Sequence, residues 1–314
     1  MDRNLLSFIA VARLGTMSAA ADALAITQPA LTKRLQLLEQ QFGTPLLERH
    51  SRGVTLTESG QQLLYYALRI RSEYQQARER LDAMSDRPPE VLRIASGPFF
   101  LFRHLGQAIV EMRKRHPGIR VVMESNPEGS NLDKLRDGEL DVVFGDRTEA
   151  HSLRTPFDFV FLPITVVNIG LLVSAASPLA RHAPLRPEDL TGVPWVEYSG
   201  TPDYRMLVRG YFMSRGLIPP EMVIETGSFF LGSQIVEHSD AVMMAPKELF
   251  PSLQQPGLSF VETDPLMGRM ETGAFLRKSS QQHAVIAEFV DSIARRAAAE
   301  GPGTPLDHTA DRRQ

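Results

Sequence analysis

Polar side chains that could read the edges of DNA bases recur along residues 28–36. Leu31, Leu35 and Leu38 are spaced so that one face of a helix would point into a core, and Phe42 is expected to join them. Helical geometry then turns the remaining positions outward, with the first of them at the exposed amino-terminal end: Gln28, Pro29, Thr32, Lys33 and Gln36. Glutamine and threonine donate to and accept from base edges, and lysine reaches phosphates. A polar face that is merely solvated would show the same pattern.

Two shorter helical segments precede this one and are expected to position it. The first carries apolar residues at helical spacing and ends at Gly15: Leu5, Phe8, Ile9 and Ala12. Ser18 is the expected cap of the second, whose alanines allow another helix to approach closely. Thr27 is the expected cap of the third helix, with Pro29 in a first turn where backbone N–H groups have no intrahelical partner. This succession is typical of a helix-turn-helix motif.

A basic turn follows the third helix. Residues 49–57, RHSRGVTLT, read as two short strands around a tight turn, as in the wing of a winged helix. Arg49 and Arg52 would lie against the DNA backbone or an adjacent minor groove. The next helix begins directly after the wing, with Thr57 or Ser59 as its cap.

The run AAADALAITQPALTKRLQLLEQQFGTPLLERHSRGVTLTESG closely resembles the DNA-binding domain of LysR-type transcriptional regulators, and the resemblance covers residues 3–60 without a gap. It implies a winged helix-turn-helix that contacts DNA through Ser18, Thr27, Gln28, Pro29, Thr32, Lys33, Arg34, Gln36, Arg49 and Arg52. The chain departs from the family at Met17, where an aromatic residue is common, and at Lys33-Arg34, where arginine followed by a neutral residue is more usual. The second departure would alter phosphate contacts and not the docking mode.

Residues 59–85 form one long helical pattern without proline. Its apolar positions alternate at intervals of four and three residues, as in a coiled coil: Leu63, Ala67, Ile70, Tyr74, Ala77, Leu81 and Met84. A helix packed on its own domain would also explain the pattern, but a small winged helix offers little surface for so long a helix. We therefore expect a dimerisation seam. The resemblance agrees, because the linker helices of these regulators pair two winged helices for two DNA half-sites.

Strand-like and helix-like segments alternate from Val91 onward. They form one βαβαβ set over 91–144, a second that begins near Val166 and continues over 193–244, and a final helix over 282–299. In parallel sheets ligands bind beyond the carboxyl ends of strands. The residues expected there are Ser96, Gly97, Pro98, Ser125, Asn126, Arg147, Ser199, Thr201 and Gly227. Ordinary turn chemistry is the alternative for each, and for Arg147, the expected anchor of a ligand carboxylate, the alternative is a surface ion pair.

The resemblance implies that this region is a two-lobed effector domain, similar to a periplasmic binding protein, with two strands crossing between the lobes. The candidate crossings are residues 159–167 and 262–272. The first opens a run without charge, from Phe159 to Ala180, that is long enough to span a bilayer. Two buried strands broken near Pro163 and Asn168 explain that run better, because parallel strands read as continuous apolar stretches.

The expected fold is therefore α+β and multidomain, built from three parts and a tail. The parts are a winged helix-turn-helix over 1–58, a linker and dimerisation helix over 59–87, and a bilobal α/β effector domain over 88–300, followed by a disordered tail over 301–314. Within the effector domain we expect a first lobe over 91–162 and 267–300 and a second over 163–266.

Composition narrows the possible function. The 34 Lys and Arg residues against 37 Asp and Glu leave a net charge of −3, so DNA binding must come from a local patch. The absence of cysteine excludes disulfides, thiolate metal sites and thiol redox sensing. The eight histidines are dispersed without metal-ligand spacing, and no nucleophile elbow, phosphate-binding loop or dinucleotide motif occurs. We expect no catalytic residue, no metal and no cofactor.

These observations predict a sequence-specific transcriptional regulator whose operator binding or activation is modulated by a small molecule held between two lobes. Its expected partners are double-stranded promoter DNA, a small-molecule effector, further copies of itself in a dimer or tetramer, and, as a candidate, RNA polymerase. No membrane is expected as a partner, and the amino terminus does not read as a signal peptide, so we expect a cytoplasmic location. An enzyme, or a solute-binding protein that uses the same cleft, is the alternative.

Overall fold

The computed structural model of the protein describes residues 2–50, 53–84, 90–124, 131–147, 159–199 and 202–299. The chain forms two compact units, Met1–Glu79 and Arg80–Gln314. Five of the predictions above fall outside the described residues: Arg52, Ser125, Asn126, Thr201 and the tail over 301–314.

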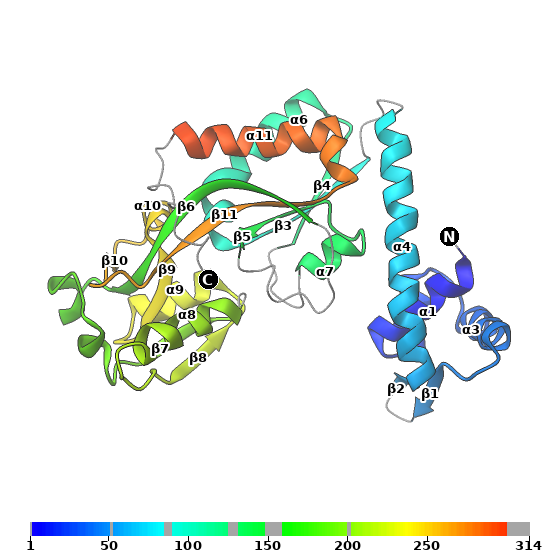
Figure 1. Ribbon diagram of the computed structural model, residues 1–314, viewed down its shortest axis with the longest axis horizontal. Coiled ribbons are helices and arrows are strands. Elements are labelled where there is room, and N and C mark those ends of the chain that lie inside the picture. The colour runs from blue at the N-terminus through cyan, green and yellow to red at the C-terminus, as the bar shows by residue number, and fades with distance from the viewer. Residues whose placement is uncertain are drawn as a thin grey trace, which may run out of the picture. The chain divides into compact units, whose positions relative to one another are not determined.

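The N-terminal unit combines helices with one small hairpin (Figure 1). Its elements are α1 (Arg3–Leu14), α2 (Met17–Ala23), α3 (Gln28–Phe42), β1 (Leu47–His50), β2 (Gly53–Leu56) and α4 (Glu58–Met84). Apolar residues from all four helices and from the segment before β1 form its core. This is the arrangement that the helical spacing predicts.

At the start of each of the helices α1–α4, a side-chain oxygen accepts hydrogen bonds from backbone N–H groups of the first turn. The capping residues are Asp2, Thr16, Thr27 and Thr57. Thr27 therefore caps α3 as predicted, and Thr57 rather than Ser59 caps α4. The prediction that Ser18 caps α2 is wrong. Ser18 lies exposed inside the first turn, and Thr16 Oγ1 accepts the N–H of Ala19 at 3.3 Å.

The inward face of α3 is shorter than predicted. Leu31, Leu35 and Leu38 are buried, but 48% of Phe42 is exposed. The helix ends there, and Gly43 turns the chain away with a positive φ of 67°. Phe42 thus lies beyond the edge of the core that its spacing suggests it should join.

The C-terminal unit is built on one mixed nine-stranded sheet. The strands are β3 (Val91–Ser96), β4 (Arg120–Glu124), β5 (Val142–Asp146), β6 (Phe159–Ser174), β7 (Trp195–Tyr198), β8 (Met222–Thr226), β9 (Val242–Pro246), β10 (Leu258–Val261) and β11 (Gly268–Arg277). Their order is β4-β3-β5-β11-β6-β9-β7-β8, with β10 paired to β6. Strands within the β3–β5 set and within the β7–β9 set run parallel, as both βαβαβ patterns predict.

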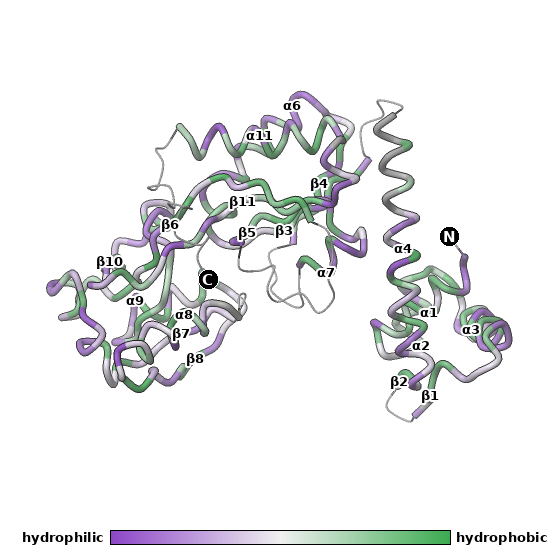
Figure 2. The backbone as a smooth tube through the Cα atoms, in the orientation of Figure 1, coloured by the Kyte–Doolittle hydropathy of each residue, from purple (hydrophilic) through white to green (hydrophobic). Residues whose placement is uncertain are grey.

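Helices cover this sheet. They are α5 (Pro98–Phe100), a π-helical turn (Leu101–Leu105), α6 (Gly106–Arg115), α7 (Asn131–Arg136), α8 (Pro202–Met213), α9 (Phe229–Glu237), η5 (Lys247–Leu249), α10 (Phe250–Leu253) and α11 (Ala284–Ala299), with short 3₁₀ turns at Pro178–Arg181, Pro187–Leu190 and Ser280–Gln282. Figure 1 shows α6 and α11 side by side over the sheet, and they contact each other. In Figure 2 these two helices alternate between hydrophilic and hydrophobic residues, whereas β6 is hydrophobic over most of its length.

The uncharged run is one long strand and not two. β6 continues through Pro163 and Asn168, so the predicted breaks there are wrong. Proline is accommodated because the register with β11 shifts between Thr272 and Gly273, where Thr165 and Pro163 are the partners and one residue bulges out. None of the helices in the described part of the chain is both long and apolar enough to span a membrane.

β6 and β11 carry the chain between two groups of elements. We call β3–β5 with α5–α7 and α11 the first lobe, and β7–β10 with α8–α10 the second lobe. The first crossing agrees with the predicted residues 159–167 but extends further. The second begins at Gly268 and not at residue 262, because Thr263 instead forms an isolated bridge with Leu185.

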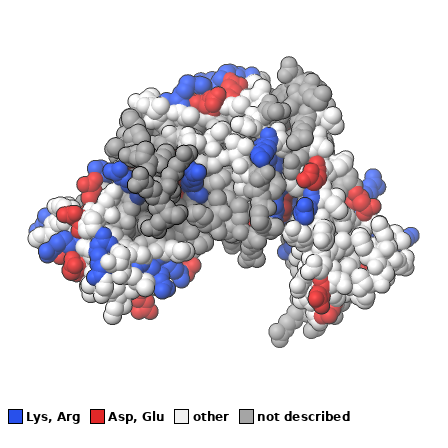
Figure 3. Space-filling view, viewed as in Figure 1, with Lys and Arg blue, Asp and Glu red and all other residues white. Residues whose placement is uncertain are grey.

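Charges of both signs alternate on the surface above α6 and α11 (Figure 3). Arg115 and His116 of the α6 end contact Glu288 of α11, and Arg296 of α11 contacts Glu111 of α6. A hydrogen bond from Arg296 holds the pKa of the Glu111 carboxyl below its ordinary value. Exposed pairs of this kind contribute little stability, so the helices are held mainly by their buried faces.

A buried arginine joins the crossing strand β11 to three elements of the first lobe. Arg277 on β11 is fully buried, and its Nη1 donates to the carbonyl of Leu135 at 2.6 Å and to that of Leu140. Its Nη2 lies 3.3 Å from the carboxylate of Asp141, which also accepts the N–H of Arg93 at 2.7 Å. The residue thereby ties α7, the start of β5 and β3 to β11.

Replacing Arg277 with alanine should lower the free energy of unfolding of the C-terminal unit by about 3–5 kcal/mol, because it leaves a buried carboxylate and two carbonyls without their partner. Urea unfolding followed by the fluorescence of Trp195, the one tryptophan of the chain, measures this. Arg269→Ala, at an exposed position of the same strand, is the control and should change stability by less than about 0.5 kcal/mol. Equal losses of unfolding free energy in Arg277→Ala and Arg269→Ala would contradict the role of Arg277 in holding these elements together.

Candidate nucleic-acid interface and ligand site

The outward face of α3 carries the polar residues that its sequence predicts. Gln28, Pro29, Lys33 and Gln36 are exposed and Thr32 is half-exposed, while the leucines behind them are buried. Thr27 Oγ1 accepts the N–H of Ala30 at 3.4 Å and so fixes the start of the helix. The face therefore offers amide, hydroxyl and ammonium groups on a rigid helix, the chemistry that a DNA major groove accepts.

Arg34 does not share this orientation with Lys33. It is half-buried, and its Nη1 donates to Ser7 Oγ of α1 at 3.3 Å. Ser7 is fully buried. In this structure Arg34 joins α3 to α1 through this bond, and its contact with DNA stays a prediction.

The wing is attached to the turn between α1 and α2. The N–H of Val54 donates to the carbonyl of Gly15 at 2.8 Å, and β1 pairs with β2 from Leu47 opposite Leu56 to His50 opposite Gly53. Gly53 has a φ of 143°, and a Cβ there would lie 2.5 Å from the Gly15 oxygen. Glycine is thus required on both grounds. Arg49 belongs to β1, as predicted.

Sequence reasoning missed the residue that joins the recognition helix to the wing. Glu39 Oε1 accepts the N–H groups of Leu46 at 2.9 Å and of Leu47 at 3.3 Å. From the other side, Thr57 Oγ1 donates to the carbonyl of Pro45 at 2.8 Å. The acidic residue that follows Leu38 is the only sequence signal for this role, and it specifies no partner.

The linker helix begins as part of the core. Leu63 and Ala67, predicted as the first two positions of the dimer seam, are buried within the N-terminal unit, so they cannot face a second copy. Ile70, Tyr74 and Leu81 are 51%, 48% and 65% exposed, and Ala77 is exposed too. The apolar stripe open to another molecule therefore starts one heptad later than predicted. The side chain of Met84 lies outside the described part of the chain.

The first lobe brings Ser96, Gly97 and Pro98 to the carboxyl end of its sheet. The N–H of Gly97 donates to the carbonyl of Phe144 at 2.8 Å, which joins the ends of β3 and β5. Ser96 is buried and its hydroxyl donates to the carbonyl of Gly97 at 2.8 Å. Pro98 opens a helical segment that runs to Arg115 through the π-helical turn. Such turns within helices occur often at functional sites.

The second lobe brings Ser199 and Gly227 to the ends of β7 and β8. The N–H of Ser199 donates to the carbonyl of Thr226 at 3.0 Å, and Gly227 is exposed. An aromatic contact joins this region to the first lobe. The ring of Phe229 lies 5.9 Å from that of Tyr198 and 6.0 Å from that of Phe102 in the π-helical turn.

Arg147 follows β5 and is engaged in an ion pair. Its Nη1 lies 2.8 Å from Glu271 Oε2 on β11, and its guanidinium lies over the ring of Phe161. The surface ion pair left open by the sequence is therefore present. Any ligand carboxylate at Arg147 would have to share or replace Glu271.

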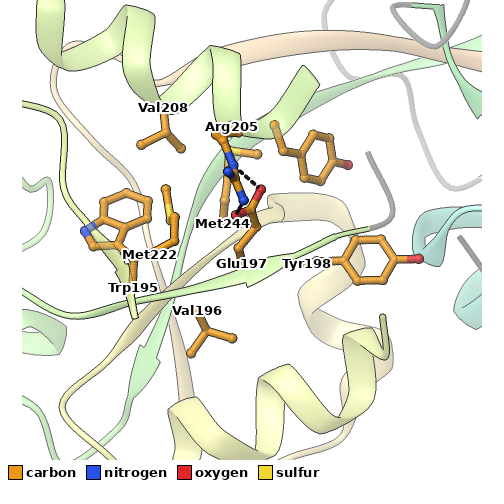
Figure 4. Close-up of a pocket in the computed structure, with 9 residues that line it drawn as sticks. Trp195, Val196, Glu197, Tyr198, Arg205, Val208, Met222 and Met244 are labelled. Carbon is orange, nitrogen blue, oxygen red and sulfur yellow. Dashed lines mark hydrogen bonds and ion pairs between the residues drawn. The ribbon is translucent and has the colours of Figure 1, made fainter. Parts of the chain in front are cut away.

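A pocket inside the second lobe was not predicted. It lies between α8 and the β7–β9 strands and is walled by Trp195, Val208, Met222 and Met244 (Figure 4). Glu197 is buried there, and its carboxylate accepts hydrogen bonds from Arg205 Nε, at 2.8 Å, and from Arg205 Nη2. This contact raises the pKa of the Arg205 guanidinium, which stays charged. The pocket contains none of the residues predicted to bind a ligand. In the described ranges, no group of acidic residues and histidines is arranged to hold a metal.

Comparison with known proteins divides the chain in the same way. Residues 3–61 match the family described as "Bacterial regulatory helix-turn-helix protein, lysR family", and residues 85–298 match "LysR substrate binding domain". TtdR of Escherichia coli (strain K12), an "HTH-type transcriptional activator", is 34% identical over 57% of this chain and 55% of its own length. The chain thus spans about half the length of that relative. The uncharacterized regulator YdcI of the same strain is 30% identical over 78% of each chain.

Solved structures show a similar fold. Full-length BenM is 25% identical, with a TM-score of 0.56 over 98% of this chain and 100% of that chain. CbnR, titled "a LysR family transcriptional regulator", is 23% identical, with a TM-score of 0.59 over 95% and 99%. A full-length OxyR from Pseudomonas aeruginosa is 20% identical, with a TM-score of 0.63 over 92% and 93%. The latter two likenesses concern the fold alone.

Replacing Glu39 with alanine should lower the free energy of unfolding of the N-terminal unit by about 1–3 kcal/mol, because the N–H groups of Leu46 and Leu47 lose their acceptor. Glu39→Gln keeps an oxygen at this position and should lose less. Hydrogen exchange at Leu46, which is 1% exposed, reports the change directly. An Ala variant that protects this amide as well as the wild type does would show that Glu39 does not hold the wing.

Proposed function

Since the chain belongs to the LysR family, we propose that it binds double-stranded promoter DNA sequence-specifically and that a small molecule bound by its C-terminal unit modulates this binding. The observation that carries the DNA part is the outward face of α3, where polar residues are exposed over a fully packed row of leucines. A helix of this kind, backed by two others and followed by a wing, suits a major groove.

Contacts with DNA divide into two kinds. Gln28 and Thr32 would meet base edges, where amide and hydroxyl groups both donate and accept. Lys33 would meet phosphates, and the wing residues Arg49 and Arg52 would add contacts to the backbone or minor groove. Ser18, Thr27, Pro29 and Gln36 complete the proposed surface. Arg34, which also holds α3 against α1, would add a phosphate contact beside Lys33.

The effector site is proposed at the carboxyl ends of the parallel strands, where sheets of this kind bind ligands. Ser96, Gly97, Pro98, Ser199 and Gly227 lie at these ends in the structure, and Ser125, Asn126 and Thr201 belong to the same site by sequence. A small polar or anionic molecule fits their hydroxyl, amide and backbone groups. A coupling of about 1–3 kcal/mol between effector and operator would be typical, and it must be reciprocal.

Assembly through α4 is part of this proposal. The exposed stripe of Ile70, Tyr74, Ala77 and Leu81, which the sequence continues to Met84, would pair with that of a second copy and set two winged helices on two half-sites. Contacts between effector domains would extend the dimer to a tetramer, and RNA polymerase is a candidate partner at the promoter. A DNA partner implies a cytoplasmic location.

Alanine at Gln28 or Thr32 should cost about 1–3 kcal/mol of operator affinity and relax base preference, because each removes a contact with base edges. Lys33→Ala should instead weaken all sequences alike and reduce the slope of log affinity against log salt by about one. Fluorescence anisotropy on a DNA fragment that co-purifies with the protein, and on random DNA, measures both effects. The control is Gln41→Ala, exposed near the other end of α3. Unchanged selectivity in both the Gln28 and Thr32 variants would refute this facing of the helix.

Glutamate at both Ile70 and Leu81 should dissociate the linker helices and abolish simultaneous binding to two half-sites, because like charges would meet within an apolar seam. Analytical ultracentrifugation and operator footprinting provide the measurements. Gln62→Glu, at an exposed position of the same helix before the stripe begins, should leave both unchanged. A double variant that sediments and protects DNA like the wild type would rule out the coiled coil.

A further inference from the structure

Arg147 and Glu271 join the first lobe to a crossing strand. Arg147 directly follows β5, and Asp146 at the end of β5 is paired with Thr272 of β11, so residues 147 and 271 are the next positions along the same ladder. Their side chains meet at 2.8 Å. β11 continues beyond this point toward Gly268, its end nearest the second lobe. The ion pair therefore lies one position beyond the last backbone pairing between β5 and β11, at the end of their ladder.

The two partners differ in their access to solvent. The side chain of Arg147 is 63% exposed, whereas that of Glu271 is 12% exposed. The described contact uses Nη1 of a guanidinium that carries five N–H donors, and a planar guanidinium binds carboxylates bidentately. Phe161 lies beneath the group, with 5.8 Å between its ring centre and Arg147 Cζ. Arg147 thus presents an exposed guanidinium group over the apolar ring of Phe161 at the carboxyl end of β5.

We propose that Glu271 occupies Arg147 in place of an effector carboxylate, and that a carboxylate-bearing effector displaces it. This rests on the proposed function, since it places the effector at the strand ends, and it adds the chemical class of the ligand. Displacement breaks one N–H···O ion pair and forms another. The exposed guanidinium of Arg147 exchanges one carboxylate for another at little cost, whereas Glu271, which is 12% exposed, loses a partner that water only partly replaces.

Displacement has a structural consequence because the crossing strands have a second tie. Pairing between β6 and β9 ends at Ile169 opposite Pro246. At the next residue Glu248 of η5 replaces the missing strand: its carboxylate accepts the N–H of Asn168 at 3.0 Å and the amide Nδ2 at 2.9 Å. Glu248 therefore holds β6 beside the second lobe, and the Arg147–Glu271 pair adds a contact at the outer end of β11, beyond the ladder with β5 and the Arg277 contacts that attach this strand to the first lobe.

An effector that takes Arg147 would release the Glu271 end of β11, while the β5–β11 ladder and Arg277 keep the rest of the strand attached to the first lobe. The crossing strands would stay held to the second lobe at Glu248, and the segment of β11 between Gly268 and Glu271 would gain freedom against the first lobe. This supplies what ligand control requires, namely two arrangements of the lobes with different affinities for the effector. Effector binding and lobe angle are linked through one carboxylate exchange.

The first test needs no ligand. Glu271→Gln and Arg147→Gln break the same pair from opposite sides, and Arg147 is exposed enough that its replacement should leave the fold intact. Hydrogen exchange over residues 265–277 of the full-length protein should accelerate several-fold in both. The control is Glu262→Gln, which breaks the exposed Lys247–Glu262 pair (2.5 Å), and it should leave these amides unchanged. Wild-type exchange in both Arg147→Gln and Glu271→Gln would overturn the proposal.

The second test measures how tightly the wild type and the two variants bind small carboxylates. Acetate, succinate and benzoate are titrated calorimetrically against sodium chloride of equal ionic strength. At least one should bind Glu271→Gln about two- to fivefold more tightly than the wild type, because the variant lacks the carboxylate that competes for the exposed Arg147 guanidinium. None should bind Arg147→Gln. Equal affinity in wild type and Glu271→Gln, retained affinity in Arg147→Gln, or no binding to Glu271→Gln would each overturn the carboxylate assignment. Operator binding by the wild type is measured separately. A wild-type protein that does not bind operator DNA would refute the proposed function instead.

Discussion

The antiparallel pairing of β6 with β11 is the constraint on which the C-terminal unit depends. Each parallel set of strands attaches to one member of this pair, β5 to β11 and β9 to β6, so both lobes are oriented by it. The pair contains a register shift at Gly273, where a Cβ would lie 2.2 Å from the carbonyl oxygen of Leu162. A side chain there would force the strands apart. The shift also allows Pro163 within the sheet, so one glycine permits a continuous connection between the lobes.

This connection explains why side chains supply hydrogen bonds along it. A strand that leaves one ladder before joining the next exposes backbone N–H groups without a strand partner, and buried groups of this kind are costly. Glu248 satisfies Asn168 on one side, and Thr272 Oγ1 donates to the carbonyl of Thr165 at 3.0 Å across the pair. Side chains thus complete the hydrogen bonding where the sheet is narrowest. Bonds made by side chains are easier to exchange than a full ladder, which suits a segment proposed to respond to a ligand.

In the N-terminal unit, too, individual hydrogen bonds hold in place the elements that are proposed to contact DNA. Its proposed contacts lie on exposed faces of α3 and the wing, but each element is held from behind: Arg34 binds Ser7, Glu39 binds the start of β1, and Gly15 binds Val54. A recognition surface gains precision when the elements that carry it are rigid. Apart from Arg34, these supporting residues touch no DNA in this proposal, yet they set the positions of residues that would.

Periodicity in the sequence by itself determined the order of elements, the facing of α3 and both βαβαβ sets, because each regular element repeats its buried positions at its own interval. It could not say what covers an apolar face. Leu63 and Ala67 have seam spacing but are buried in their own domain, and Phe42 has core spacing but lies past the core's edge. Nor could it reveal that Glu271 occupies Arg147, 124 positions away. Only the tertiary structure decided these points, because cross-strand neighbours and the limits of a core are set by how elements meet in space.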